Sequence, residues 1–333
     1  MVKRTTLLTS IITLYTVIAA AVCLSLIHSW TISRQVIPYG AVQGASTISL
    51  VSSASQPVVA PYPKLTSPIY AGSVAAHQFV LYHVESGKVI AQSTNLQPVA
   101  IASTTKLTSS IIITQHLPLD MVITVTPEAS SQTGSLMGIR AGEQYTVQDL
   151  LEGMLMVSGN DAVYQLAETT GGVLLNNPNA PYQDRINAFV AEMNKLAGTL
   201  HLENSHYADP AGLNDDGHSD ALDLAKVASE VRTIPVLAKI TSTADSTVQD
   251  QSGKHVFQLK NSNRIVSEYD FEGAGMGKTG FTPTAGHCLV ASATRNGNTL
   301  IAVVLNTYST APDASAQVAK DLLERGFAQT EFQ

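Results

Sequence analysis

The longest apolar segment of the chain lies near its N-terminus. Between Arg4 and Arg34 there is no Asp, Glu, Lys or Arg, and residues 7–27 are long enough to span a bilayer as a helix. Basic residues precede this segment, which predicts a cytoplasmic N-terminus with the remainder of the chain outside. We expect residues 1–34 to be an uncleaved membrane anchor, because the small residues at 19–21 lie inside the apolar run and not after it. A cleavable signal is the alternative.

A change in composition marks the next boundary. From residue 35 to residue 63 the chain has no Asp, Glu, Lys or Arg and is rich in Ser, Ala, Val, Gln and Pro, a composition typical of a linker. We assign the linker to residues 35–65. Residues 66–333 then form a single folded domain, which is long enough for one large core.

Alternation of apolar and polar residues predicts two β-hairpins in this domain. Residues 78–83 and 88–91 flank a Glu-Ser-Gly turn. Residues 288–294 and 300–306 flank an Asn-Gly pair, which is a strong signal for a tight hairpin turn. Strands at both ends of the domain, with helices between them, favour an α+β fold. We expect one antiparallel sheet packed with helices, plus an inserted helical subdomain.

Apolar spacings of three and four residues predict the helices. The clearest is at residues 184–197, where the apolar residues share one face and Gly198 ends the helix. Further helices are predicted at residues 146–156, 161–168, 219–232 and 314–325. Ser219 would cap the third of these, and a Gly-Gly pair would end the second.

Composition narrows the possible functions. The net charge is −7, 44% of the residues are hydrophobic, and there is no basic run. The chain therefore lacks the electrostatic signature of a nucleic-acid-binding protein. The two cysteines, Cys23 and Cys288, have neither metal-binding nor redox spacing, so the sequence predicts neither a cysteine metal site nor a disulfide.

Three short motifs supply candidate catalytic groups. They are Ser103-Thr-Thr-Lys106, Ser158-Gly-Asn160 and Lys278-Thr279-Gly280. Together they provide a nucleophile, two proton-transfer candidates, an amide and a cationic anchor. These groups can open and rehydrolyse an acyl bond without histidine, cysteine or metal. Each motif alone is common in helices or turns, but all three in this order favour catalysis.

The chemistry suggests a role for each motif residue. Ser103 is the candidate nucleophile, and helical spacing would bring Lys106 onto the same face as its base. A lysine is a base only when neutral, so we expect burial and the nearby charge of Lys278 to lower its pKa. Ser158 would relay the proton to the leaving amine. The residues expected to bind substrate are Asn160 at a backbone amide, Lys278 and Thr279 at a carboxylate, and Gly280 where a ligand strand lies close.

The motifs and the sequence around them resemble the D-alanyl-D-alanine carboxypeptidases, low-molecular-mass penicillin-binding proteins of the serine peptidase S11 type. The resemblance extends over roughly residues 66–330 and includes the segments between the motifs. The segments that carry it are residues 99–108, 154–162, 189–195, 202–213, 277–282 and 285–294.

The resemblance implies a β-lactamase/transpeptidase-like fold and a serine-type carboxypeptidase. Such an enzyme trims the terminal D-alanine of peptidoglycan stem peptides through an acyl-enzyme, here on Ser103, with no cofactor or metal. β-Lactam antibiotics would be acylating inhibitors. Together with the anchor, the resemblance implies that the enzyme lies at the extracytoplasmic face of the bacterial cell membrane.

The resemblance also implies a helix at residues 104–114, where β-branched residues alone would favour a strand. Many relatives carry a further all-β domain, which we do not expect here.

One departure from the family concerns the substrate carboxylate. Many relatives have an arginine just before the last helix, and this chain has none between residues 295 and 325. We expect Lys278 and Thr279 to carry most of the carboxylate recognition, with a smaller contribution from Arg264. Phe281, directly after the third motif, is a further candidate substrate contact. D,D-Endopeptidase activity on cross-links is therefore an alternative function.

Two other functions share parts of this pattern. A serine β-lactamase has the same motifs but needs a residue, usually a glutamate, that speeds deacylation, and the sequence has no convincing candidate. A catalytically silent cell-wall binding protein would not need an intact nucleophile and lysine. Stable penicillin labelling, fast turnover or no labelling would distinguish the carboxypeptidase, the lactamase and the binder.

Two further patterns have simpler explanations. Residues 273–280 contain Gly-x-Gly-x-x-Gly, but a phosphate-binding loop opens a helix, whereas Pro283 and a strand follow this segment. His201, His206 and Asp209 could bind zinc, yet their spacing matches no helical ligand pair. Polar loop residues are the simpler interpretation.

Overall fold

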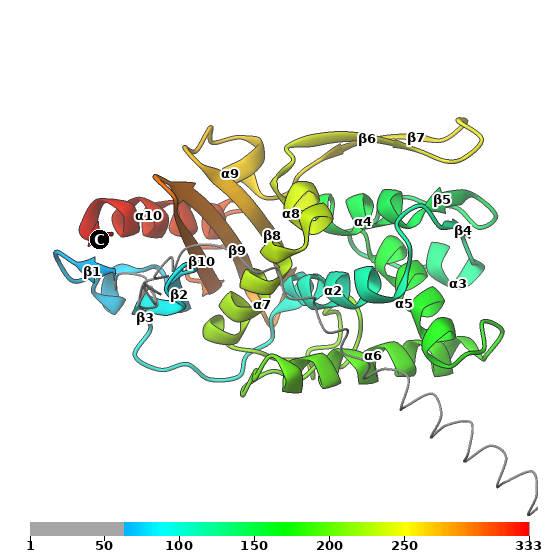
Figure 1. Ribbon diagram of the computed structural model, residues 1–333, viewed down its shortest axis with the longest axis horizontal. Helices are drawn as coiled ribbons and strands as arrows, with labels where there is room; N and C mark the ends of the chain where they lie inside the picture. The colour runs from blue at the N-terminus through cyan, green and yellow to red at the C-terminus, as the bar shows by residue number, and fades with distance from the viewer. Residues whose placement is uncertain (1–62, 333) are drawn as a thin grey trace, which may run out of the picture. The chain divides into compact units, whose positions relative to one another are not determined.

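The computed structural model describes residues 63–332 (Figure 1). The strands are β1 (Lys64–Leu65), β2 (Ala76–His83), β3 (Lys88–Gln92), β4 (Val122–Thr124), β5 (Gln144–Thr146), β6 (Asp245–Gln249), β7 (Val256–Lys260), β8 (Ala274–Thr282), β9 (Gly286–Arg295), β10 (Asn298–Thr307) and β11 (Thr330–Glu331). The helices are the 3₁₀ turns η1 (Ala71–Ser73) and η2 (Ala102–Thr105), then α2 (Lys106–His116), α3 (Pro127–Ser130), α4 (Val147–Met156), α5 (Asn160–Leu174), α6 (Tyr182–Thr199), α7 (Ala221–Thr233), α8 (Pro235–Ser242), α9 (Arg264–Ser267) and α10 (Ala314–Gln329).

A five-stranded antiparallel sheet of order β3-β2-β10-β9-β8 organises the domain. Successive residues of its central strands enter two hydrophobic cores on opposite faces. Val80, Val290 and Val303 belong to one core, and Leu81, Ala291 and Ala302 to the other. Both predicted hairpins are present. The tight turn between β9 and β10 consists of Asn296 and Gly297, which both have positive φ.

Helices cover both faces of this sheet (Figure 1). α10 packs on one face, where Ala319, Leu322 and Leu323 join the smaller core. α7 lies against the other face, and a helical region that includes α2, α4, α5 and α6 extends beyond it. The predicted α+β architecture with an inserted helical region is thus confirmed.

The helix that local propensity disfavours is present as α2. All residues from Lys106 to Ile113 are buried, because α4, α5, α6 and α7 surround the helix. Tertiary packing on every side therefore outweighs the preference of β-branched residues for strands. A helix buried on all faces also lacks the polar face that would have made its 3.6-residue period visible in the sequence.

Three predicted helix boundaries are wrong. α5 continues through Gly171 and Gly172, and α6 continues through Gly198. An added Cβ at Gly171 would lie 1.9 Å from the carbonyl oxygen of Arg185 on α6, so this glycine marks a close helix contact and not a helix end. The N-cap of α7 is not Ser219. It is Asp220, whose carboxylate accepts a hydrogen bond from the N–H of the third residue of α7 at 2.8 Å.

The β6–β7 hairpin was not anticipated by the hydrophobic pattern. Each of its strands has a single buried residue, so the alternation that would predict a strand is weak. The hairpin leads into Ser262 and α9, which border the catalytic cavity described below. Because this hairpin was not predicted, the sequence analysis also did not predict the wall of the cavity that the hairpin leads into.

The two ends of the described chain lie side by side. β1 pairs with β11, so residues 64–65, which we assigned to the linker, belong to the folded domain. Among residues 63–332, no helix has the length and apolar character needed to cross a bilayer. The predicted anchor at residues 1–34 lies outside the described residues and stays a prediction.

Candidate active site

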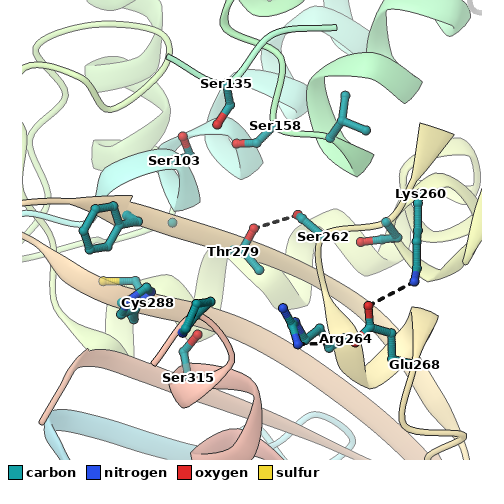
Figure 2. Close-up of a pocket in the computed structure, with 16 residues that line it drawn as sticks. Ser103, Ser135, Ser158, Lys260, Ser262, Arg264, Glu268, Thr279, Cys288 and Ser315 are labelled. Carbon is teal, nitrogen blue, oxygen red and sulfur yellow. Dashed lines mark hydrogen bonds and ion pairs between the residues drawn. The ribbon is translucent and has the colours of Figure 1, made fainter. Parts of the chain in front are cut away.

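The three motifs meet at one cavity, although they come from separate elements (Figure 2). Ser103 lies in η2, directly before α2. Ser158 lies in the turn between α4 and α5, and Thr279 lies on the edge strand β8. All three line a cavity of about 520 Å³. The fold therefore brings together residues that are far apart in the sequence.

Ser103 and Lys106 are in direct contact. Lys106 Nζ lies 2.8 Å from Ser103 Oγ, as expected for residues one helical turn apart. Lys106 is fully buried, whereas Ser103 lines the cavity. The candidate base is thus shielded from water, and the candidate nucleophile that it contacts is open to the cavity.

The other partners of Lys106 determine where its lone pair points. Nζ also lies 2.8 Å from Asn160 Oδ1 and 3.2 Å from the carbonyl oxygen of Ala211. Both of these atoms are pure acceptors. A neutral amine has two N–H groups, so donating one to each acceptor leaves its lone pair directed at Ser103. This arrangement favours transfer of the Ser103 proton to a neutral Lys106.

Burial makes that neutral form accessible near neutral pH. It lowers the pKa of Lys106 from 10.5 to about 7, although the negative charges of Asp209 and Asp161 act to raise it. We expected Lys278 to contribute to this lowering. Instead, burial first and the charge of Lys106 second lower the pKa of Lys278 well below its usual value. A permanent positive charge on Lys278 is therefore disfavoured.

Ser158 links the second motif to the third. Lys278 Nζ donates to Ser158 Oγ at 2.9 Å and to the carbonyl oxygen of Thr279 at 2.8 Å. Ser158 has a φ of 63°, and Ala102, directly before the nucleophile, has a φ of 48°. Left-handed backbone is unfavourable for residues other than glycine and is often found at functional sites. Both serines are therefore positioned by backbone that the surrounding fold must hold in place.

Asn160 lies behind the lysine and not at the cavity wall. Its side chain is buried, Oδ1 contacts Lys106, and Nδ2 donates to the carbonyl oxygen of Thr133 at 2.6 Å. Both ends of the amide that we expected to bind substrate already have protein partners. Asn160 therefore contacts Lys106 in this structure, and one N–H of its amide is already used by Thr133.

Gly280 is required by the close approach of two backbone segments. An added Cβ at this position would lie 3.1 Å from Ser103 N and 3.0 Å from the carbonyl oxygen of Ile101. The glycine thus lets β8 run directly past the nucleophile. Because β8 is an edge strand, it can also present backbone groups to an extended peptide.

A charged outer wall, formed by Lys260, Arg264 and Glu268, borders the same cavity (Figure 2). Lys260 Nζ lies 3.0 Å from Glu268 Oε1, and Arg264 Nη1 lies 3.4 Å from Glu268 Oε2. An arginine remains charged throughout the working pH range. Since Arg264 lines the cavity and the buried Lys278 does not, Arg264 is the better-placed cation for a substrate carboxylate. The sequence pattern predicted the larger contribution from Lys278, and this prediction of the order stays open to the test described in the Discussion.

Thr279 and Phe281 also face the cavity, on either side of Gly280. Thr279 Oγ1 lies 2.7 Å from Ser262 Oγ, so the two hydroxyls form a pair next to the outer wall. Phe281 is 57% exposed, and its ring lies 4.6 Å from that of His287. Both side chains border the space that a substrate would occupy.

Asp161, which the sequence analysis did not select, anchors the loop beside the site. Its buried carboxylate accepts hydrogen bonds from the N–H groups of Met137, Gly138 and Ile139 at 2.8, 2.7 and 3.1 Å. The loop that carries Ser135 into the cavity is thereby fixed to the start of α5. An acidic residue in the first turn of a helix is common, so the sequence has no specific signal for this role.

Asp209 has a similar supporting role. Its carboxylate accepts hydrogen bonds at 2.6, 2.8 and 2.6 Å from N–H groups within residues 211–214, the loop whose Ala211 carbonyl contacts Lys106. The zinc alternative placed His206 beside Asp209. The backbone of His206 pairs with that of His218 in an isolated antiparallel β-bridge. Within residues 63–332, no group of three His, Cys, Asp or Glu side chains is arranged to hold a metal ion.

Comparison with known proteins adds independent information. Residues 64–309 match the peptidase S11 family, described as D-alanyl-D-alanine carboxypeptidase. The chain is 33% identical over 262 residues to the D-alanyl-D-alanine carboxypeptidase DacF of Bacillus subtilis, and the match covers 77% of this chain and 63% of that protein. It is 31% identical over 250 residues to a D-alanyl-D-alanine endopeptidase of Pseudomonas aeruginosa, covering 74% of this chain and 76% of that protein. The crystal structure of the Streptomyces K15 DD-transpeptidase is similar with a TM-score of 0.71 at 28% identity, covering 78% of this chain and 100% of that chain.

Proposed function

Because the chain belongs to the peptidase S11 family of D-alanyl-D-alanine carboxypeptidases, we propose that it removes the terminal D-alanine from peptidoglycan stem peptides ending in D-Ala-D-Ala. The observation that carries this proposal is the 2.8 Å contact between Ser103 Oγ and the buried Nζ of Lys106. β-Lactam antibiotics would acylate the same serine and inhibit the enzyme. The reaction requires no cofactor or metal, because the serine and lysine supply the nucleophile and the base.

In the acylation step, Ser103 Oγ attacks the carbonyl carbon of the penultimate D-alanine while its proton moves to the neutral Lys106. The C–N bond to the terminal D-alanine then breaks. Ser158 donates its proton to the leaving amine, and the proton held by Lys106 replaces it. The products are an ester between Ser103 and the shortened peptide and one free D-alanine. The bond between Ser158 and Lys278 at 2.9 Å supports this role for Ser158, because it fixes the hydroxyl in the cavity.

In the deacylation step, water attacks the ester carbonyl and transfers a proton to Lys106. The bond from the carbonyl carbon to Ser103 Oγ breaks, and the proton returns to Ser103. One water is consumed in each cycle, and no group of the enzyme is changed. A pKa of about 7 for Lys106 suits both steps, since the lysine must gain and lose a proton in turn.

We assign substrate binding to the groups that border the cavity beside Ser103. Thr279 and Arg264 would hold the terminal carboxylate, and Phe281 would contact the acyl portion of the peptide. Gly280 would let an extended peptide lie along β8. Asn160 and Lys278 would act from behind the cavity surface, by orienting Lys106 and Ser158.

A second candidate function is D,D-endopeptidase activity on cross-links. It is supported by the similarity to the endopeptidase of Pseudomonas aeruginosa and by the N-terminal end of α10, where Pro312 before the helix and Ser315 in its first turn line the cavity without charge. Without an arginine there, the requirement for a free C-terminus is weaker. A comparison of kcat/KM for a pentapeptide and for a cross-linked dimer distinguishes the two activities.

We further propose that the enzyme is held at the extracytoplasmic face of the cell membrane by residues 1–34. The support is the uncharged apolar stretch at residues 7–27 with basic residues before it. Membrane fractionation, followed by N-terminal sequencing of the mature protein, tests this. A protein that is recovered from the medium and lacks these residues would contradict the anchor.

The activity itself is tested with purified full-length protein and a pentapeptide ending in D-Ala-D-Ala. We expect release of a single D-alanine, and no release by Ser103→Ala. Incubation with penicillin separates the alternatives. A carboxypeptidase gives a long-lived adduct, a β-lactamase turns penicillin over rapidly, and a silent binding protein forms no covalent adduct.

A further inference from the structure

Ser135 places a further hydroxyl group in the catalytic cavity, next to those of Ser103 and Ser158. Ser135 lines the same cavity, and Figure 2 shows the three hydroxyl groups directed toward one another. The backbone carbonyl of Ser135 accepts a hydrogen bond from Asn160 N at 2.8 Å, but its hydroxyl has no hydrogen-bond partner within residues 63–332. A hydroxyl group that is directed into a reactive cavity without a protein partner is free to bind water or substrate.

The loop around Ser135 is fixed by several hydrogen bonds, although residues 133–136 are exposed. Asp161 fixes residues 137–139, and Asn160 Nδ2 binds the carbonyl oxygen of Thr133 at 2.6 Å. Gly134 has a φ of 86°, and an added Cβ there would lie 2.9 Å from Asn160 Nδ2. These contacts come from the same two residues that start α5 beside Lys106. The position of Ser135 is therefore coupled to that of the base.

Among the catalytic residues, Lys106 and Ser158 can contact the deacylating water, which leaves it one short of the roughly three hydrogen bonds that an ordered water typically makes. The two N–H groups of a neutral Lys106 are used by Asn160 and Ala211, so only its lone pair faces the ester. The base and Ser158 each supply one partner, and the sequence offers no glutamate for the third.

We propose that Ser135 binds the water that hydrolyses the acyl-enzyme. Its hydroxyl and that of Ser158 hold the water against the ester carbonyl, while Lys106 accepts the proton. Bonds form and break as in the deacylation step described above, and Ser135 is unchanged at the end. This inference rests on the proposed acyl-enzyme at Ser103, since without an ester there is no water to place.

The test uses full-length protein and compares two rates, the acylation of Ser103 by penicillin and the decay of the adduct. Ser135→Ala should lengthen the adduct lifetime about tenfold, the effect of one lost hydrogen bond in the transition state. Acylation should stay within about threefold of wild type. Ser135→Thr keeps the hydroxyl and should largely preserve the lifetime. The matched control is Ser131→Ala, because Ser131 lies in the same loop and its hydroxyl donates to the carbonyl oxygen of Glu128 at 2.9 Å.

An unchanged lifetime in Ser135→Ala would overturn the inference. An equal loss in both rates would also overturn it, because a residue that only supports the loop would slow the two steps alike. With the pentapeptide, kcat should fall if deacylation limits turnover, while kcat/KM stays near the wild-type value. Absence of any adduct on Ser103 in the wild type would instead contradict the proposed function, so the two failures are distinguishable.

Discussion

The two sides of the catalytic cavity each contain a lysine, but in opposite environments. On the inner side, Lys106 is 0% exposed, and burial brings its pKa to about 7. On the outer wall, the side chain of Lys260 is 57% exposed and forms an ion pair with Glu268. Burial, and not residue type, decides which lysine can serve as a base. The inner side is therefore suited to proton transfer, and the outer wall to recognition of charge.

This contrast predicts that substitutions on the inner side have much larger effects than those on the outer wall. A buried group acts at low dielectric and has few alternative partners. An exposed ion pair is screened by water and contributes between zero and about 1 kcal/mol.

The largest effect is expected for Lys106→Arg. An arginine cannot lose its proton in the working range, so the variant replaces a base that can become neutral with a permanent cation. Acylation by penicillin should fall roughly 10²–10⁴-fold, the usual contribution of a general base. The measurement is the second-order rate constant of adduct formation, together with circular dichroism to show that the variant folds.

The matched control for this variant is Lys260→Arg on the outer wall. It should change acylation by less than about threefold, because an exposed ion pair can re-form with arginine. Near-normal acylation by Lys106→Arg would show that another group accepts the proton of Ser103. A large effect of Lys260→Arg would remove the distinction between the two sides.

The second effect concerns pH. Lys106 is protonated and inactive as a base below its pKa of about 7. The acylation rate of the free enzyme should therefore fall about tenfold for each pH unit below 7 and level off above it. A stopped-flow profile from pH 5 to about pH 9 measures this. A rate that keeps rising through pH 9 would mean that the pKa of the base is close to that of an exposed lysine.

The sequence predicted the inner side of the site far better than the outer wall. Ser103, Lys106, Ser158 and Lys278 belong to short motifs, and such motifs can be recognised without knowing the fold. Arg264 was selected only as the cation nearest to the third motif. Lys260 and Glu268 reach the cavity through the β6–β7 hairpin and α9, which have too little apolar periodicity to be predicted.

In the fold, too, the features visible in the local sequence were predicted and those that depend on tertiary packing were not. Hairpins and amphipathic helices with one buried face were predicted, because their periodicity is visible in the sequence. α2 has no exposed face and its helical state depends on its neighbours, so propensity suggested the wrong structure. Gly171 was taken for a helix end, since the close contact with Arg185 is set by the packing of two helices and not by the local sequence.

The third effect concerns recognition of the carboxylate. We expect wild type to prefer a substrate with a free terminal D-alanine over its amide by about tenfold. Arg264→Ala should remove this preference, because its guanidinium is the charged group that lines the cavity next to Thr279. Lys278→Ala should slow acylation of acid and amide alike, since Lys278 supports Ser158 from a buried position.

The measurement is kcat/KM for paired acid and amide substrates on both variants. Loss of the preference in Lys278→Ala, with the preference retained in Arg264→Ala, would restore the order expected from the sequence. It would also mean that the buried lysine acts directly on substrate. Lys260→Ala is the control, because it removes a charge from the same wall but leaves Arg264 in place.

The smallest effect is expected for metal removal. Exhaustive chelation should leave D-alanine release unchanged, because the proposed steps use only serine, lysine and water. The assay compares rates before and after dialysis against a strong chelator. Loss of activity that zinc restores would revive the set of His201, His206 and Asp209 as a metal site.

The most direct test of the central claim is to locate the acyl group by mass spectrometry of full-length protein treated with penicillin. The account predicts one adduct, on the peptide that contains Ser103, and none in Ser103→Ala. Ser109 is buried and its hydroxyl donates to the carbonyl oxygen of Pro210 at 2.7 Å, so it should remain unlabelled. An adduct on Ser158 or Ser109 in the wild type would contradict the assignment of Ser103 as the nucleophile.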